Sequence, residues 1–287
     1  MAQNGFQPGL FHSFDYVGGK ESLRSLHLMM QIVGKVRLKL FPKRENYQHV
    51  TLFPDSRGFT TRPIPFRGVA FEIAIDLVDL VCRVVSSDGR ACVFPLQTPI
   101  ATFYQSFIEG LGSLDIDISI RPDPYDIPGE TTPFGEDTRP RDFDVPTVRS
   151  IWQIYLGMNM VLEELASGFP GKIIYPRFYW HHIDISSYRF HQTGSAAPEQ
   201  SISSGFWIGD DSVGEPMLFS YLYPTPTKLI DDAKLVPGGF WGDNHMALMR
   251  YNEVADMRDS YDKCLNFYRS AVEVFGATGK WDTPTST

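Results

Sequence analysis

The sequence predicts an α+β protein with a mostly antiparallel sheet and several packed helices. Short segments in which apolar and polar residues alternate follow one another before residue 86 and again after residue 172. Longer segments carry apolar residues at helical spacing. At 287 residues, with 43% hydrophobic and 21% charged residues, the chain suits one globular domain, residues 1–287.

Five strands are expected in the first third of the chain, separated in part by turn formers such as Pro54-Asp55 and Ser87-Asp88-Gly89. Their ranges are 35–41, 49–53, 58–64, 71–77 and 79–85. In the first of them basic and apolar residues alternate. We therefore interpret Lys35, Arg37 and Lys39 as the solvent face of a strand.

Four helices are expected, and glycines or prolines mark their ends. The first covers 21–34 and ends at Gly34, and the second begins with Thr98 as N-cap and Pro99 at its first position. The third covers 145–168, and the last covers 260–276 and ends at Gly276. Between the second and third we expect a strand at 115–120 and a long proline-rich surface loop at 121–146.

Aromatic residues are unusually frequent and gather in the second half of the chain. They make up 14% of the sequence, with 21 Phe and 13 Tyr, which suits the lining of an apolar cavity. Four aromatic strands are expected there, at 172–180, 183–190, 204–209 and 217–224.

Composition excludes several classes of function. A net charge of -8 opposes binding to a phosphate backbone, so we expect no nucleic-acid partner. No apolar segment approaches the length of a membrane helix, and the N-terminus lacks the pattern of a signal peptide. Cys82, Cys92 and Cys264 have no paired spacing, which indicates a reducing compartment, and we expect a cytoplasmic protein.

Motifs for cofactor chemistry are missing or weak. No phosphate-binding or dinucleotide-binding glycine motif occurs, so no cofactor is expected. His182 and Asp184 have the spacing of two metal ligands on one strand face, with His191 or His245 as a third. Hydrogen-bonded structural histidines are the favoured interpretation, because this two-residue motif often occurs by chance.

Several polar residues lie in apolar surroundings. Because buried polar groups must be paired, they either form structural networks or face a pocket, and the structural interpretation is preferred. The residues are His27, Gln31, Lys35, Arg37, His49, Lys172, Arg177, Asp184 and Arg189.

A dozen short motifs occur in an order and spacing similar to one family. Among them are LHLMMQIVGKVRL (26–38), RGFTTRPIP (57–65), TPFGED (132–137), FPGK (169–172), SSGFWIG (203–209), YLYPTP (221–226) and KWD (280–282). Through them the chain resembles the domain-of-unknown-function family 5996 of bacterial and fungal proteins over nearly its whole length. The resemblance implies eight shared polar positions and no reaction. They are His27, Gln31, Lys35, Arg37, His49, Asp184, Arg189 and Trp207.

The chain departs from the family pattern at some polar positions. Glu45-Asn46-Tyr47-Gln48-His49 stands where the family shows Asn-His-Trp-Trp-His, and Arg177 replaces a histidine. Residues 179–184 replace Phe-Trp-Gly-Ser-Phe-Asp, and Glu199-Gln200 replaces a His-Glu pair. The resemblance therefore implies that this member has altered the family's polar centre.

From these features we expect a cofactor-independent enzyme of specialised metabolism, such as a cyclase, isomerase or pericyclic catalyst, acting on an apolar small molecule. His49, Lys35 and Arg189 are the candidate catalytic donors. Candidate substrate-binding residues are His27, Gln31, Arg37, Tyr179, Trp180, Asp184, Phe206, Trp207, Phe219, Tyr221 and Tyr223. Two alternatives stay open: a metal-dependent enzyme using His182 and Asp184, and a non-catalytic small-molecule-binding protein.

Overall fold

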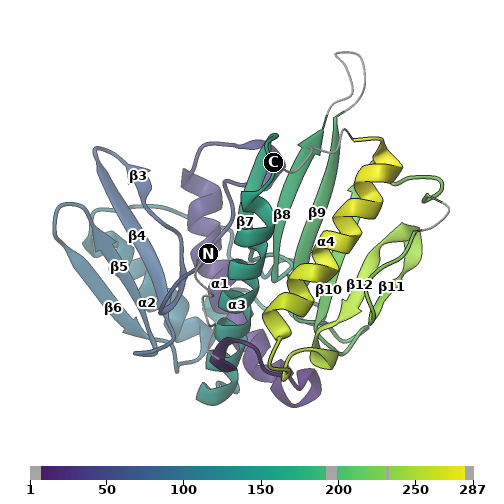
Figure 1. Ribbon diagram of the computed structural model, residues 1–287. Coiled ribbons are helices and arrows are strands. Elements are labelled where there is room, and N and C mark those ends of the chain that lie inside the picture. The colour runs from purple at the N-terminus through teal and green to yellow at the C-terminus, as the bar shows by residue number, and fades with distance from the viewer. Residues whose placement is uncertain (1–7, 192–198, 231–232, 282–287) are drawn as a thin grey trace. The chain divides into compact units, whose positions relative to one another are not determined.

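The computed structural model describes residues 8–191, 199–230 and 233–281 (Figure 1). These residues form two compact units, each containing one antiparallel six-stranded sheet. The N-sheet unit comprises residues 17–152 and 178–183. The C-sheet unit comprises the described residues of 1–16, 153–177 and 184–287. The chain therefore passes between the units several times, and neither unit is one continuous segment.

The N-sheet unit is built on a sheet with strand order β1-β2-β4-β5-β6, with β3 also paired to β4. Its strands are β1 (Phe53–Pro54), β2 (Gly58–Thr60), β3 (Ile64–Phe66), β4 (Val69–Asp76), β5 (Val81–Ser86) and β6 (Ala91–Pro95). Helix α2 (Ile100–Ser113) packs on β6, since the rings of Phe103 and Phe107 contact Phe94 at centroid distances of 6.3 and 5.9 Å. Almost all of helix α1 (Tyr16–Leu40) belongs to this unit, and its apolar residues from Leu26 to Val36 are buried.

Residues 178–183 return to the N-sheet unit from a distant part of the sequence. The backbone of Phe178 forms an antiparallel bridge with Leu52, and its ring lies 4.8 Å from that of Phe59. The indole N–H of Trp180 donates to the carbonyl of Val50 at 2.5 Å. These contacts fix Trp180 beside α1.

The C-sheet unit has the strand order β11-β12-β10-β9-β8-β7. Its strands are β7 (Ile173–Tyr179), β8 (Asp184–His191), β9 (Gln200–Trp207), β10 (Met217–Tyr223), β11 (Gly239–Trp241) and β12 (Ala247–Arg250). Helix α4 (Ser260–Gly279) crosses β9 and β10, and Tyr268 donates to the carbonyl of Gly205 at 2.8 Å (Figure 1). From helix α3 (Val145–Ser167), Tyr155 packs edge-on against Phe206 of the same sheet face.

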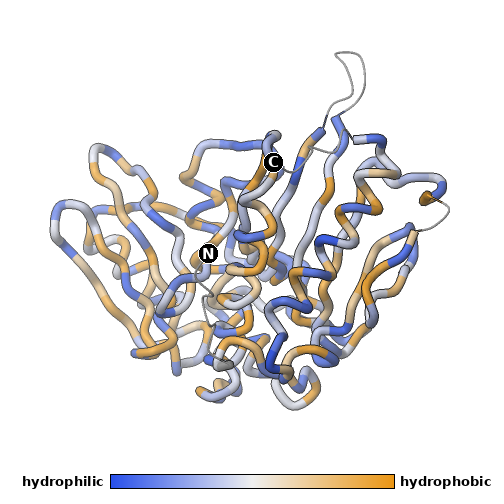
Figure 2. Tube along the Cα trace, viewed as in Figure 1, coloured by the Kyte–Doolittle hydropathy of each residue, from blue (hydrophilic) through white to orange (hydrophobic). Residues whose placement is uncertain are grey.

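Hydropathy is mixed along both units. Polar and apolar residues alternate along the strands and helices rather than gathering in one segment (Figure 2). Within the described part of the chain, no helix combines the length and the apolar character needed to cross a membrane.

The α+β prediction with mostly antiparallel strands is confirmed. The predicted strands at 71–77 and 79–85, the aromatic strands after residue 172 and the helix at 145–168 match β4, β5, β7 to β10 and α3. The segment 121–144 contains one short 3-10 helix, Phe134–Glu136, and otherwise has no helix or strand, as predicted. Strands β6, β11 and β12 had no counterpart in the prediction.

The predicted strand at 35–41 is wrong, because α1 continues through Gly34 to Leu40. A glycine ends a helix only where the backbone turns to positive φ, whereas Gly34 stays helical and supplies space. A Cβ atom at this position would lie 2.3 Å from Cδ1 of Trp180. Lys35 and Arg37 are consequently buried on a helix, and only Lys39 is exposed.

Three smaller predictions are also corrected. Residues 115–120 form no strand, and only Phe53 of the predicted strand 49–53 enters a named strand. Pro99 rather than Thr98 occupies the N-cap of α2, because the helix starts one residue later. Helix α4 passes Gly276 and ends at Gly279, where Lys280 adopts the left-handed conformation with φ 56°.

The contact between Gly34 and Trp180 predicts a steric cost. In Gly34→Ala the new methyl group would collide with an indole ring that is held by its hydrogen bond to Val50. We expect a loss of about 1–3 kcal/mol in the free energy of unfolding, measured by urea denaturation. Gly112→Ala in α2 is the matched control, because open space surrounds that position and alanine should be neutral or stabilise by up to about 1 kcal/mol. Equal stability of both variants would contradict the packing argument.

Candidate functional site

The N-sheet unit contains a pocket of about 540 Å³ at the C-terminal end of α1. Three structural elements form its walls: the last turns of α1, the segment 119–126 and Trp180. The lining residues are Lys35, Leu38, Lys39, Ser119, Ile120, Arg121, Asp123, Pro124, Tyr125, Asp126 and Trp180. Two of the residues expected at the site from sequence, Lys35 and Trp180, therefore line the same pocket.

Lys35 is the buried cation of this pocket. Its side chain leaves the apolar side of α1, and Nζ donates to the backbone carbonyls of Arg121, at 3.2 Å, and Asp123. The ammonium group also lies 4.6 Å from the centre of the Phe134 ring. Burial disfavours the charged amine, and despite the opposing effect of Asp123 it lowers the pKa of Lys35 to about 8.

Gln31 lies one turn before Lys35 and fixes the opposite wall. Its amide nitrogen donates to the carbonyl of Tyr125 at 2.7 Å, and its amide oxygen accepts from the Tyr125 backbone N–H, also at 2.7 Å. The side chain therefore satisfies both backbone groups of one residue in a segment that has no strand partner. The role of Gln31 is to hold Tyr125 in the pocket wall.

His27 supports the wall from the preceding turn of α1. Its Nε2 lies 2.7 Å from the carbonyl oxygen of Trp180, and because a carbonyl oxygen only accepts, Nε2 carries the proton. Burial lowers the pKa of His27 to about 4, against the raising effect of that carbonyl. His27 is therefore neutral at physiological pH and positions Trp180.

Arg37 and His49 lie in the same unit but do not line the pocket. The guanidinium of Arg37 donates to the carbonyl of Thr61 and lies 4.1 Å from the centre of the Phe41 ring. His49 accepts at Nδ1 from the backbone N–H of Arg44 at 3.3 Å, and burial lowers its pKa. Both side chains are buried in structural contacts.

The geometry expected for a metal site at His182 and Asp184 is wrong. Strand β8 begins at Asp184, and Ile183 has φ 52°, so His182 precedes the strand in a turn. The alternation that would place both side chains on one face therefore does not apply. Exposed His182 lies 3.5 Å from Asp126, and the described residues contain no group of three His, Cys, Asp or Glu side chains able to hold a metal ion.

In the C-sheet unit, Arg189 binds the C-terminal end of helix α3. It donates to the carbonyl of Leu165 in the last turn of α3, where the helix dipole favours a cation. Burial, together with nearby Arg269, lowers the pKa of Arg189 to about 10. This arginine therefore caps α3 within the C-sheet unit.

The aromatic strands separate onto two faces of the C-sheet. Residues directly opposite across β8, β9 and β10 share one face: Asp184, Trp207, Phe219, Tyr221 and Tyr223. Phe206 points to the other face, where it contacts Tyr155 and Tyr251. Burial raises the pKa of Asp184 to about 7, although a hydrogen bond with Ser186 opposes the shift. The sequence analysis listed Phe206 with Trp207 among the candidate substrate-binding residues, whereas the strand register places the two side chains on opposite faces.

Comparison with family models gives one match, the family of unknown function DUF5996, over residues 11–287. The chain belongs to this family. No curated protein and no solved structure matches the chain. Membership of DUF5996 brings no reaction with it, because the function of the family is unknown.

Segments 45–49 and 179–184, at which the resemblance implies departures from the family pattern, contact each other. Tyr179 donates to the backbone carbonyl of Asn46 at 3.2 Å, and Asn46 and Tyr47 both have positive φ, 49° and 52°. Histidines introduced by the second segment are also close to the pocket, since the His181 ring lies 6.3 Å from that of Tyr125. Burial lowers the pKa of His181 to about 4, so this histidine is neutral. The two departures therefore belong to one region of the N-sheet unit.

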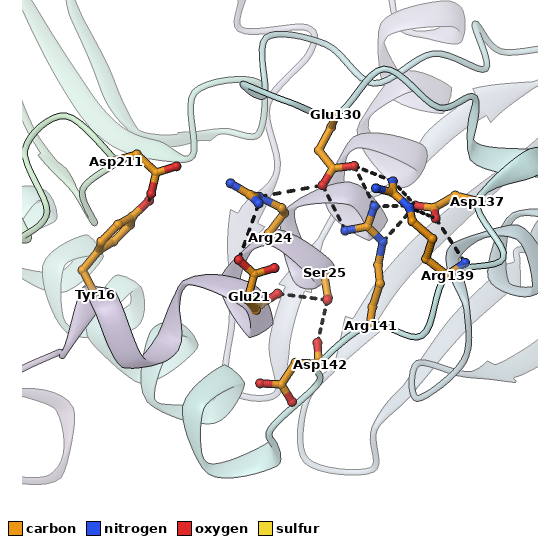
Figure 3. Close-up of polar contacts among 10 residues, drawn as sticks. All are labelled: Tyr16, Glu21, Arg24, Ser25, Glu130, Asp137, Arg139, Arg141, Asp142 and Asp211. Carbon is orange, nitrogen blue, oxygen red and sulfur yellow. Dashed lines mark hydrogen bonds and ion pairs between the residues drawn. The ribbon is translucent and has the colours of Figure 1, made fainter.

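The segment 121–144 is fastened along α1 over its whole length. Ser25 donates to the carbonyl of Asp142 at 2.6 Å (Figure 3). The backbone N–H of Asp144 donates to Ser22, and Gln31 and Lys35 bind the other end of the segment. The segment consequently runs antiparallel to the helix. Sequence analysis identified Gln31 and Lys35 as polar residues in apolar surroundings. It missed the pocket residues Arg121 and Tyr125, for which loop length was the only signal.

A carboxylate–guanidinium cluster closes the middle of this segment (Figure 3). Glu130 binds Arg141 at 2.7 Å and Arg139 at 2.8 Å, and Asp137 binds both arginines as well. Burial alone would raise the pKa values of Glu130 and Asp137, but the arginines outweigh it and hold both below their usual range. The figure also shows Tyr16, which donates to Asp211 at 3.3 Å within the C-sheet unit.

Removing the Gln31 clamp should loosen the pocket wall. Gln31→Met keeps the length of the side chain and leaves both backbone groups of Tyr125 without partners. We expect amide hydrogen exchange across 121–126 to accelerate about tenfold or more, since each lost buried hydrogen bond costs about 1–3 kcal/mol. Gln48→Met removes one exposed hydrogen bond and should leave this region unchanged. Unchanged exchange in the Gln31 variant would show that the clamp does not hold the segment.

Removing Arg141 should give a pH-dependent loss of stability. At neutral pH, Arg141→Met leaves two buried carboxylates short of a partner, and we expect a loss of about 3 kcal/mol in the free energy of unfolding. Carboxyl groups with depressed pKa values stabilise the fold above their usual range, and that contribution disappears as pH falls. The difference from wild type in urea denaturation should therefore narrow below about pH 4. Lys263→Met, which removes an exposed ion pair, is the control and should cost less than about 1 kcal/mol.

Proposed function

We propose that this protein is a cofactor-independent enzyme, of cyclase or isomerase type, that acts on an apolar small molecule bound in the pocket of the N-sheet unit. The observation that carries the proposal is the amine of Lys35, which lies in the pocket wall with its pKa lowered to about 8. A general acid or base works best when its pKa is close to the pH of the reaction. Lys35 meets that condition without a metal or an organic cofactor.

The surroundings of Lys35 support proton transfer. At pH 7 a group with a pKa of about 8 is roughly nine-tenths protonated, so an ammonium can donate to a developing oxyanion while a neutral fraction can accept a proton. The carbonyls of Arg121 and Asp123 orient Nζ and accept from either form. The enzyme's contribution would be a fixed donor beside a held substrate.

The remaining wall suits an apolar substrate. Leu38 and Tyr125 expose 46% and 51% of their surface, and Ile120, Pro124 and Trp180 add further apolar contacts. Because His27 and Gln31 fix Trp180 and Tyr125, the shape of this wall is set before a ligand enters. A preformed apolar wall can hold a flexible molecule in a reactive conformation.

A non-catalytic binding protein is the second candidate. It is favoured by the hydrogen bonds of Gln31, His27 and Lys35 to backbone groups, because these contacts already occupy polar atoms of the three side chains. A pocket built in this way can bind a ligand without reacting with it. The metal-dependent alternative lacks a comparable observation, since its two proposed ligands do not share a strand face.

The proposal requires a reachable amine that loses its proton near pH 8. Trace acetylation with acetic anhydride, followed by peptide mass spectrometry at increasing pH, should give a midpoint of about 8 for Lys35, against about 10.4 for an unperturbed lysine. Nα-acetyl-lysine in the same tube is the reference. Labelling of Lys35 only after addition of denaturant would overturn the assignment of this amine as an acid or base.

A substrate, once found, separates the two candidates. Lys35→Met should lower kcat by about 100-fold or more if the amine transfers a proton, with ligand binding largely retained. Binding with no turnover in the wild-type protein would favour the non-catalytic candidate instead.

A further inference from the structure

Cations dominate the polar part of the pocket wall. Lys35, Lys39 and Arg121 line it together with two acids, Asp123 and Asp126, in a protein whose net charge is -8. A basic site on an acidic chain needs an explanation, because the average surface potential works against it.

Both acids of the wall already lie beside another basic side chain. Asp123 pairs with Arg121 at 3.2 Å, and Asp126 lies 3.5 Å from the imidazole of His182. By contrast, no carboxylate among the described residues lies within ion-pair distance of Lys35 or Lys39. The two lysines are therefore the cations of the wall without a direct ion pair to any described residue, although the charge of Asp123 acts on Lys35 from a longer distance.

The two lysines also lie close together along the chain. They stand four residues apart on α1, and side chains at that spacing are neighbours on one helix face. Arg121 adds a further cation whose charge lowers the pKa of Lys35. An anion bound beside these cations would be attracted by their charges. Lys39 in the last turn of α1 also interacts favourably with the helix dipole. Its contribution to helix stability must therefore be measured separately from its contribution to binding.

We propose that the molecule held in this pocket carries an anionic group, such as a carboxylate or sulfonate, at one end of an otherwise apolar body, with Lys35 and Lys39 binding the anion and Leu38, Tyr125 and Trp180 contacting the body. This inference rests on the proposed function and narrows its substrate class. The charged and the apolar residues line the same pocket, so one small molecule can contact both.

Two fluorescent probes with nearly the same body test the inference. 8-Anilinonaphthalene-1-sulfonate carries an anion, whereas N-phenyl-1-naphthylamine lacks it. We expect the sulfonate to bind at least about tenfold more tightly, with an affinity that falls as salt is added. Lys39→Met should weaken binding of the sulfonate about fivefold or more and leave the neutral probe unchanged. Lys43→Met, which removes an exposed lysine outside the pocket, should change neither.

Protection of Lys35 from trace acetylation locates the probes in the pocket. The sulfonate should protect Lys35 and should take up protons on binding at pH 8, because a nearby anion favours the ammonium form. Proton uptake is measured by calorimetry in two buffers with different ionisation enthalpies. Urea denaturation of Lys39→Met separates a loss of helix stability from a loss of binding.

The outcomes distinguish this inference from the proposed function. Equal affinity for both probes, with protection of Lys35 and no effect of Lys39→Met, would overturn the anionic group and leave the pocket as a site for apolar molecules. Failure of the sulfonate to protect Lys35 would overturn the inference as well. An amine that is labelled only in denaturant would instead overturn the proposed function, whatever the probes do.

Discussion

Helix α1 has to bury polar side chains along with its apolar ones, and the need to pair them shapes the N-sheet unit. Gln31 and Lys35 are almost fully buried, and an unpaired buried polar group would cost several kcal/mol. Their partners are the backbone groups of 121–125, which have no sheet of their own to bond with. The side chains of the helix and the backbone of the segment therefore satisfy each other's hydrogen bonds. Residues 121–146, which contain six prolines, follow one path along the helix as a result.

The pocket is a consequence of the same pairing. Because Gln31 and Lys35 hold the segment at its backbone, the side chains of Tyr125 and Pro124 are left to form a wall. The second wall depends on Gly34, whose missing side chain admits the indole of Trp180. Side chains that do not line the pocket, such as Gln31, thus determine its shape, while Lys35 both fastens the segment and lines the pocket.

Local patterns were sufficient for much of the fold and for part of the candidate site. Alternation identified β4 and β5, and apolar spacing identified α3, since in these elements the local pattern and the tertiary burial agree. The argument that buried polar residues need partners selected His27, Gln31 and Lys35, which do surround the pocket or its walls. It could not assign them partners, because Tyr125 and Trp180 are about 90 and 150 residues away along the chain.

The failures have equally specific causes. Residues 35–41 alternate like a strand, but they continue helix α1. In this conformation the residues after Gly34 are buried together with the apolar residues before it. Phe206 was grouped with Trp207 by composition, although adjacent strand residues face opposite sides of a sheet. Arg189 and Arg37 were selected as polar residues in apolar surroundings, and in the structure they donate hydrogen bonds to the carbonyls of Leu165 and Thr61.

The interleaving of the two units along the chain has a consequence for how the protein is made. The N-sheet unit is incomplete without residues 178–183, which supply the bridge to Leu52 and the indole beside α1. These residues leave the ribosome only after 25 residues of the C-sheet unit, 153–177, have been synthesised. Folding of the N-sheet unit during translation can thus begin early but cannot finish before part of the C-sheet unit has been synthesised. No single cut in the backbone would release an intact half, and gene fusions or deletions that move one half without the other would break both.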